Sequence, residues 1–274
     1  MKKNSLFDIE NQVIVITGAA GVLAGNTARY LLAQGAHVVM LDLRRDAVEQ
    51  AVAECRENIS PRVSGYAGSV LEPDTLQDIY ARIMAEHGRI DVLINGAGGN
   101  MPGATIGPEQ TIFDLDLDDY DRVLDLNLKG SLLPTITFAR AMTQQHSGCI
   151  VNFSSMAAGQ ALTRVLGYAN AKAAIENFTR WMAVELARKF GGNIRVNAVA
   201  PGFFIGNQNR ALLLQPDGTP TPRGRQVIAK TPLGRFGEPD EICGAVHYLI
   251  SNAARFVTGT VLPVDGGFSA YTGV

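Results

Sequence analysis

Val13-Ile14-Val15-Ile16-Thr17-Gly18-Ala19-Ala20-Gly21 is a β-branched run that ends in a glycine-rich turn. A short, continuous apolar run of this kind is typical of a strand buried on both faces of a parallel sheet. The pattern that follows predicts a helix over 23–34, ended by Gly35, and a second strand over 36–41 that closes on Asp42. The unit has the spacing of a dinucleotide site, in which backbone N–H groups and a helix N-terminus face the pyrophosphate and the carboxylate faces a ribose.

The same alternation of apolar strands and amphipathic helices continues along the chain. It predicts an α/β fold of the doubly wound Rossmann type, with a mostly parallel seven-stranded sheet and helices on both faces. Further strands are expected over 62–67, 90–94, 148–153, 194–200 and 261–264, and further helices over 46–59, 73–86, 118 past 127, 168–189 and 240–251. No linker divides the sequence, so we expect a single domain over 1–274.

Residues 203–232 differ from the rest because four prolines lie between Pro216 and Pro232. We expect this segment to be irregular and to form a mobile substrate lid beside the pocket.

Composition limits the class of protein. The chain has 274 residues, 46% of them hydrophobic, and a net charge of -2, which does not favour nucleic acid as a partner. Cys55, Cys149 and Cys243 show neither a disulfide pattern nor metal-ligand spacing. No apolar run approaches the roughly 18 residues of a membrane span. We therefore expect a cytoplasmic protein with a small-molecule substrate, no metal, no nucleic acid and no membrane association.

Tyr168 and Lys172 are four residues apart. In a helix they lie on the same face, one turn from each other. A free tyrosine has a pKa of about 10, and a nearby ammonium is predicted to lower it because the positive charge favours the phenolate. Ser155 follows the strand over 148–153 and is placed to stabilise charge on the same reacting oxygen. The three residues predict a general acid/base site, with a surface Tyr/Lys pair as the alternative.

Two further stretches bear on binding sites. Asn95-Gly96-Ala97-Gly98-Gly99 is a second glycine-rich turn after an expected strand, at the edge where open α/β sheets bind ligands. The acidic run over 114–119 resembles the start of a calcium loop, but it lacks the glycine at position six and the glutamate at position twelve. We therefore interpret it as helix capping.

These motifs, in this order, resemble the short-chain dehydrogenase/reductase family over nearly the whole chain. The resemblance rests on Thr17-Gly18-Ala19-Ala20-Gly21, Asn95-Gly96-Ala97-Gly98, Asn127, Ser155, Tyr168 with Lys172, Pro201-Gly202 and Val264-Asp265-Gly266-Gly267. Within the family, residues 98–100, 201–204, 207–213 and 264–271 are most similar to the D-mannonate oxidoreductase (fructuronate reductase) type. The resemblance implies hydride transfer between NAD(H) and a CH–OH carbon of a sugar acid, and a homotetramer, with a dimer as the alternative.

The resemblance also implies roles for individual residues. Tyr168 would be the acid/base, Lys172 would lower its pKa and hold the nicotinamide ribose, and Ser155 would bind the substrate oxygen. Asn127 would hold a water that links Lys172 to solvent. The implied cofactor-binding residues are Gly18, Gly21, Val22, Leu23, Asp42, Ser69, Val70, Asn95, Ala97, Gly98, Tyr168, Lys172, Pro201 and Gly202. The candidates for binding a sugar acid are Asn100, Arg164, Asn207 and Arg210, since a carboxylate needs a cation.

Asp42 predicts a preference for NAD over NADP, because a carboxylate accepts the ribose hydroxyls and repels a 2′-phosphate. Arg44 and Arg45 are either a phosphate site or an exposed helix start. Val22 and Ala24 stand where the family usually has glycines, Ser69 where it often has an acid, and Gly206 where many relatives carry threonine.

Two alternative functions remain open at this point. One is a general ketone or 3-ketoacyl reductase of the same family. The other is a non-catalytic sensor that binds the dinucleotide, and the complete set of Asn127, Ser155, Tyr168 and Lys172 argues against it.

Overall fold

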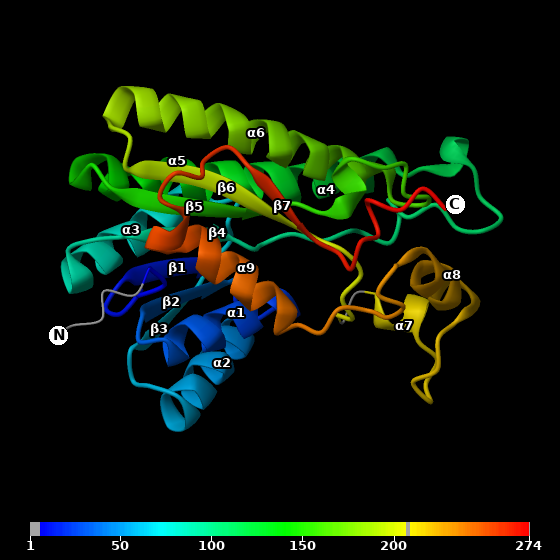
Figure 1. Ribbon diagram of the computed structural model, residues 1–274, viewed down its shortest axis with the longest axis horizontal. Coiled ribbons are helices and arrows are strands. Elements are labelled where there is room, and N and C mark those ends of the chain that lie inside the picture. Colours follow the sequence, from blue (N-terminus) through cyan, green and yellow to red (C-terminus); the bar gives the residue numbers. More distant parts are fainter. Residues whose placement is uncertain (1–5, 207–208, 274) are drawn as a thin grey trace.

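The computed structural model describes residues 6–206 and 209–273. Seven strands form one sheet in the order β3-β2-β1-β4-β5-β6-β7, and every neighbouring pair is parallel (Figure 1). The strands are β1 (Val13–Thr17), β2 (His37–Asp42), β3 (Val63–Ala67), β4 (Val92–Asn95), β5 (Gly148–Phe153), β6 (Ile194–Pro201) and β7 (Val261–Val264). The doubly wound fold is confirmed, and its direction of winding reverses between β1 and β4, where such sheets bind ligands.

Helices cover both faces of the sheet (Figure 1). One face packs against α1 (Val22–Ala33), α2 (Arg45–Asn58) and α9 (Glu241–Ile250), and the other against α3 (Pro73–His87), α5 (Gly130–Gln145) and α6 (Leu166–Phe190). Short 3₁₀ turns lie at η1 (Ile112–Asp114), η3 (Met156–Ala158) and η4 (Asn252–Ala254). Among the described residues, no helix has the length and apolar character needed to cross a bilayer.

The acidic run over 114–119 caps a helix, as expected. Asp116 is the N-cap of α4 (Leu117–Leu124), and its side chain accepts a hydrogen bond from the backbone N–H of Asp119. α4 continues through a π-helical turn (Asp125–Lys129) into α5. Within the described part of the chain, no cluster of His, Cys, Asp and Glu side chains is arranged to hold a metal ion.

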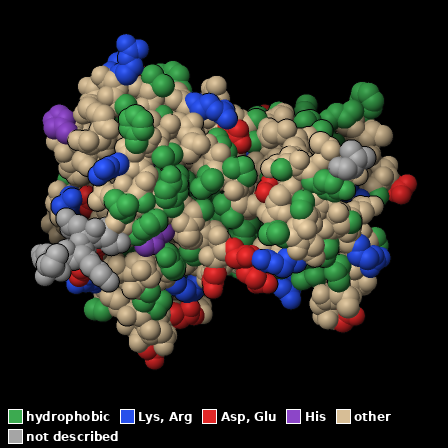
Figure 2. Space-filling model, in the orientation of Figure 1, with side chains coloured by type: hydrophobic (Ala, Val, Ile, Leu, Met, Phe, Trp, Pro, Cys, Tyr) green, Lys and Arg blue, Asp and Glu red, His purple; other side chains and the backbone are tan. Residues whose placement is uncertain are grey.

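The mobile lid over 203–232 stays a prediction. Among its described residues, the segment is irregular only in part, so the prediction of an irregular course was wrong where two helices form. It contains α7 (Arg210–Leu213) and α8 (Pro222–Lys230), and Thr221 caps α8 by accepting the N–H of Gly224 at 3.0 Å. Pro222 starts this helix, because the first helical position needs no N–H donor. Figure 1 shows α7 and α8 beyond the carboxyl edge of the sheet, and Figure 2 shows a notch at the waist of the molecule, where acidic and basic side chains gather.

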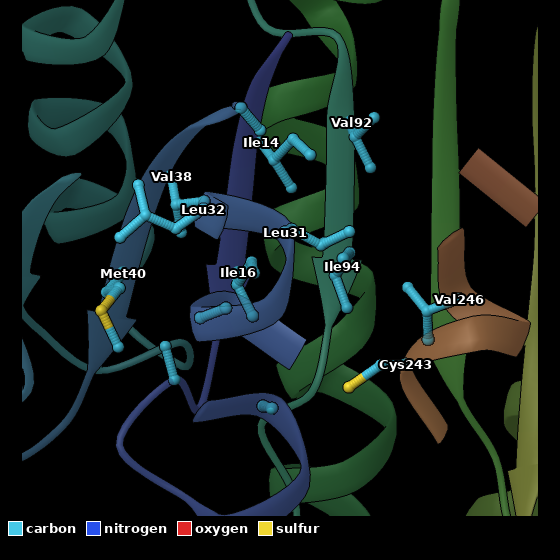
Figure 3. Packing of buried hydrophobic residues seen from close by; sticks show 14 of the residues in the cluster. Ile14, Ile16, Leu31, Leu32, Val38, Met40, Val92, Ile94, Cys243 and Val246 are labelled. Carbon is cyan, nitrogen blue, oxygen red and sulfur yellow. The ribbon is translucent and has the colours of Figure 1, made fainter. Parts of the chain in front are cut away.

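Buried side chains alternate between the two faces along each strand. Ile14 and Ile16 of β1 pack toward α1 and α9, whereas Val13 and Val15 pack toward the opposite face. Figure 3 shows side chains of β1, β2, β4, α1 and α9 meeting in the first of these layers. A smaller third cluster joins Met156, Leu213, Val227 and Phe268, and it attaches α7 and α8 to the loop after β5.

Candidate active site

The carboxyl ends of β1, β4 and β5 lie in register. Thr17 pairs with Asn95, and Asn95 pairs with Asn152. The chain continues from these ends into the two glycine-rich turns and into Ser154-Ser155, so segments far apart in sequence meet at one edge.

Ser155, Tyr168 and Lys172 are brought together as predicted. α6 begins at Leu166, which places Tyr168 and Lys172 one turn apart near its start. Ser155 is hydrogen-bonded to the Tyr168 side chain, and its Oγ also accepts the N–H of Ala157 at 3.2 Å. Lys172 is buried and donates to the carbonyl oxygen of Phe153 at 2.8 Å, and its Nζ lies 5.4 Å from the centre of the Tyr168 ring. Ser155 thus lies beside Tyr168, as predicted, and also caps a turn, while its role toward a substrate oxygen stays a prediction.

The electrostatics of this trio differ from the prediction. Burial raises the pKa of Tyr168, and the hydrogen bond from Ser155 lowers it by less. Burial lowers the pKa of Lys172 to about 7. The expected net lowering of the Tyr168 pKa by Lys172 is therefore not found, because desolvation acts on both groups and destabilises both charged forms.

Asn127 is fully buried in the π-helical turn and fastens the second glycine-rich turn. Its Nδ2 donates to the carbonyl oxygens of Gly99 at 2.7 Å and Val123 at 2.8 Å, and its Oδ1 accepts the N–H of Gly99 at 3.2 Å. A Cβ at Gly98 would lie 2.6 Å from Asn127 Oδ1 and 3.3 Å from Lys172 Nζ. A side chain at Gly98 would therefore collide with Asn127 and crowd Lys172. The water-holding role of Asn127 stays a prediction.

The first glycine-rich turn fits a pyrophosphate. Gly18 has φ +66°, and a Cβ there would lie 2.8 Å from the Cα of Ala97. Gly21 is the N-cap of α1, and among the described residues no side chain accepts a hydrogen bond from the first turn of this helix. The N–H groups of that turn are therefore free to bind an anion, and the helix dipole favours one.

Asp42 ends β2 beside this turn. Its Oδ2 accepts the N–H of Ala20 at 3.0 Å and its Oδ1 the N–H of Arg44 at 3.2 Å, so the carboxylate is held in place. Arg44 and Arg45 are exposed at the start of α2, and Arg45 pairs with Glu49 at 3.5 Å. Together, the turn and the fixed carboxylate fit a dinucleotide whose ribose carries free hydroxyls.

Other residues predicted to bind the cofactor lie at or near the same edge. Ser69 accepts the N–H of Leu71 at 3.1 Å, and Asn95 donates to Thr135 and Asn152 at 2.9 and 2.8 Å, so both side chains are engaged within the protein. Leu23 packs against the core, and Val70 lies within it. Ala97 is in the second glycine-rich turn, and Pro201-Gly202 lies at the end of β6.

Val22 and Gly206, two departures from the family pattern, are neighbours. A Cβ at Gly206 would lie 3.8 Å from Val22 Cγ2, in ordinary van der Waals contact. The side chain of Val22 thus lies beside position 206, where many relatives carry threonine and this chain carries glycine.

The predicted substrate residues have different surroundings. Asn100 donates to Thr105 Oγ1 at 2.6 Å, and its Oδ1 is buried without a partner among the residues that the structure describes. Arg164 has φ +78°, Arg210 is exposed at the start of α7, and Asn207 lies outside the described residues. Sequence reasoning missed Arg223, whose guanidinium lies against Thr163, because it expected no helix over 222–230.

The comparisons with known proteins agree with this geometry. A short-chain dehydrogenase family model, described as "Enoyl-(Acyl carrier protein) reductase", matches residues 18–269. An uncharacterized oxidoreductase of Haemophilus influenzae is 44% identical over 278 residues, covering 97% of this chain and 96% of the relative. The chain belongs to the short-chain dehydrogenase/reductase family. It is therefore an oxidoreductase of the kind that acts on CH–OH groups.

Two solved structures of this family illustrate the likeness. A Haemophilus protein with the provisional name D-mannonate oxidoreductase, crystallised with bound NAD, has a TM-score of 0.90 and 44% identity, covering 97% of this chain and 98% of its own. A gluconate 5-dehydrogenase of Burkholderia cenocepacia, in complex with NADP and tartrate, has a TM-score of 0.84 and 29% identity, with coverage of 97% and 98%.

Proposed function

We propose that this protein is an NAD(H)-dependent oxidoreductase of sugar acids, with D-mannonate and D-fructuronate as its alcohol and ketone. The observation that carries the proposal is the hydrogen bond between Ser155 and Tyr168, with Lys172 buried beside them and the dinucleotide cradle at the same sheet edge. The Haemophilus relative with bound NAD supports the cofactor and, by its provisional name, the substrate.

The chemistry divides between cofactor and protein. Bound NAD(H) accepts or supplies the hydride. In the reductive direction, Tyr168 donates its proton to the carbonyl oxygen, and the raised pKa of Tyr168 keeps the phenol protonated and able to do so. Ser155 stabilises the charge that develops on that oxygen. Lys172, with a pKa lowered to about 7, readily exchanges a proton near neutral pH and can restore the proton of Tyr168.

The residues expected to bind the cofactor lie at the same carboxyl edge of the sheet. The first turn of α1 and Gly18 would hold the pyrophosphate, and Asp42 the adenosine ribose. Lys172 would hold the nicotinamide ribose. The exposed position of Arg44 and the pairing of Arg45 with Glu49 favour NAD over NADP.

The test measures NADH oxidation with D-fructuronate, neutral keto sugars and a β-ketoacyl thioester. We expect the highest kcat/KM with the keto acid, and a loss of kcat of roughly 10²–10⁴-fold in Tyr168→Phe with the affinity for NADH retained. A Tyr168→Phe protein that turns over as fast as the parent would contradict the mechanism.

A 3-ketoacyl reductase is the second candidate. It is favoured by a 3-oxoacyl-[acyl-carrier-protein] reductase of Thermotoga maritima, which is 33% identical over 259 residues, covering 94% of this chain and 98% of the relative. A higher kcat/KM for the β-ketoacyl thioester than for the keto acid would select this candidate.

A further inference from the structure

Two arginines from different segments lie together at the carboxyl edge of the sheet. Arg164 is in the loop between β5 and α6, and Arg223 is in the first turn of α8. Arg223 donates from Nη1 to Thr163 Oγ1 and from Nη2 to the Thr163 carbonyl oxygen, both at 3.4 Å. Burial and, secondarily, the charge of Arg164 lower the pKa of Arg223. Because Thr163 directly precedes Arg164 in the chain, these hydrogen bonds hold Arg223 against the segment that carries Arg164.

This pair is incompletely satisfied within the protein. Over residues 6–206 and 209–273, neither Arg164 nor Arg223 forms a salt bridge. Arg223 Nε is buried and has no hydrogen-bond partner within the described part of the chain. A buried charged donor without an acceptor is costly, so this atom points to a missing ligand.

The backbone conformation of Arg164 is a second, independent observation that points to a binding site. Its φ of +78° is strained for a residue with a side chain, and such strain persists mainly at functional sites. The Arg164 carbonyl oxygen accepts the N–H of Ile106 at 3.0 Å, which helps to fix the conformation. Three segments therefore meet at the pair, namely the loop after β4, the loop before α6, and α8.

The position relative to Tyr168 fits a substrate-binding site. Arg164 lies four residues before Tyr168, just ahead of the start of α6. Asn100, in the loop that also contains Ile106, has a buried Oδ1 that finds no partner over residues 6–206 and 209–273. Figure 1 shows α8 at the end of the molecule where α6 begins and the strands end.

We propose that Arg164 and Arg223 together bind the carboxylate of the sugar acid, and that α8 thereby supplies a specificity-determining residue. Arg223 presents Nε and an adjacent Nη along one edge of its guanidinium, the geometry that matches a carboxylate with two parallel hydrogen bonds. The substrate's negative charge also relieves the repulsion between the two cations. This assignment rests on the proposed function. Of the two cations predicted from the sequence, Arg164 and Arg210, it selects Arg164 and adds Arg223.

The test compares Arg223→Gln with Arg225→Gln, which removes an exposed guanidinium from the same helix. Steady-state kinetics with NADH are measured for D-fructuronate and for its uncharged methyl ester. In Arg223→Gln we expect the KM for the acid to rise by about 10–100-fold with kcat within about threefold of the parent, and the preference for acid over ester to fall by the same factor. Arg225→Gln is expected to match the parent.

Binding without turnover gives a second readout. Calorimetry measures the Kd of D-mannonate for the Tyr168→Phe protein saturated with NAD, with and without Arg223→Gln. We expect Arg223→Gln to raise this Kd by about 10–100-fold. Arg223→Lys keeps the charge but loses the two-pronged geometry, so an intermediate rise is expected; it serves as the test variant if Arg223→Gln does not fold.

The outcomes separate the two proposals. If the parent turns over D-fructuronate but Arg223→Gln leaves KM and the acid/ester preference unchanged, the arginine pair is overturned and the proposed function stands. If the parent does not turn over D-fructuronate, the proposed function fails. The calorimetric Kd then tests the arginine pair by itself. Weaker D-mannonate binding in Arg223→Gln supports the proposed carboxylate site, and unchanged or absent binding overturns it.

Discussion

Asp42 is the side chain that we expect to set cofactor choice. Both of its oxygens accept backbone N–H groups, so the carboxylate is oriented before any ligand arrives. A fixed negative charge repels a 2′-phosphate more effectively than a mobile one, because it cannot turn away.

We therefore expect Asp42→Asn to raise the ratio of kcat/KM for NADPH over NADH by roughly tenfold or more, since the amide removes the charge and keeps an acceptor. Initial rates with both cofactors measure the ratio. Asp46→Asn, an equal change of charge in the first turn of α2, is the control and should leave the ratio unchanged. An equal response in the two variants would count against a role for Asp42.

Lys172 makes a prediction about stability and pH. Its pKa is about 7 in the folded protein and near 10.4 in an unfolded chain. Between these values the unfolded state binds more protons, so the free energy of unfolding rises with pH, whereas below pH 7 the buried charge destabilises the fold in full.

Chemical denaturation of the parent and of Lys172→Met, from pH 6 to 9, tests this. The stability of the parent relative to Lys172→Met should increase across this range by about 1–3 kcal/mol. Lys189→Met, which removes an exposed lysine paired with Glu185, should show no such trend. A parallel pH dependence in parent and Lys172→Met would refute the buried-amine interpretation.

At the scale of the element, two glycines differ in the space around them, so alanine should have opposite effects on stability at the two positions. Gly98 is enclosed by Asn127 and Lys172, whereas Gly244 is exposed in α9 and a Cβ there would meet nothing within 4 Å.

Gly98→Ala should destabilise the protein by about 1–3 kcal/mol, because the added methyl forces buried groups apart, and should lower activity as Asn127 and Lys172 shift. Gly244→Ala should stabilise it by about 0.5–1 kcal/mol, because alanine favours the helix. Thermal unfolding and NADH oxidation measure both effects. The enclosed turn would be refuted by a Gly98→Ala protein as stable and active as the parent.

The elements also show what the sequence could and could not predict. β1 was predicted with its observed bounds, because a buried parallel strand is a continuous β-branched run with clear ends. α8 was missed because its prolines suggested a break, although Pro222 begins the helix. The pKa directions of Tyr168 and Lys172 could not be derived from spacing, since desolvation depends on tertiary packing around both side chains. Arg223 was missed together with its helix.

At the scale of the whole molecule, large apolar side chains are exposed on outer surfaces. Trp181 and Val184 on α6 are 60% and 57% exposed, Ile136 on α5 is 50% exposed, and Phe256 is fully exposed before β7. Such exposure is typical of surfaces buried between subunits. It supports the homotetramer implied by the family resemblance.

We expect light scattering after size-exclusion chromatography to give the mass of four chains. Trp181→Glu should reduce that mass, because a carboxylate in a buried interface lacks a partner. Ala81→Glu places the same charge on the exposed face of α3 and should leave the mass unchanged. A monomeric parent would contradict the expectation.

β1 lies inside the sheet and pairs with both β2 and β4, although residues 43–91 separate β2 from β4 in the chain. During synthesis, β1 and β2 leave the ribosome first, and one side of β1 stays without its neighbour until β4 emerges. At about 5–20 residues per second, that interval lasts several seconds. A nascent chain therefore carries an open, apolar strand edge through this period, and such an edge is a site at which chains aggregate unless a chaperone covers it.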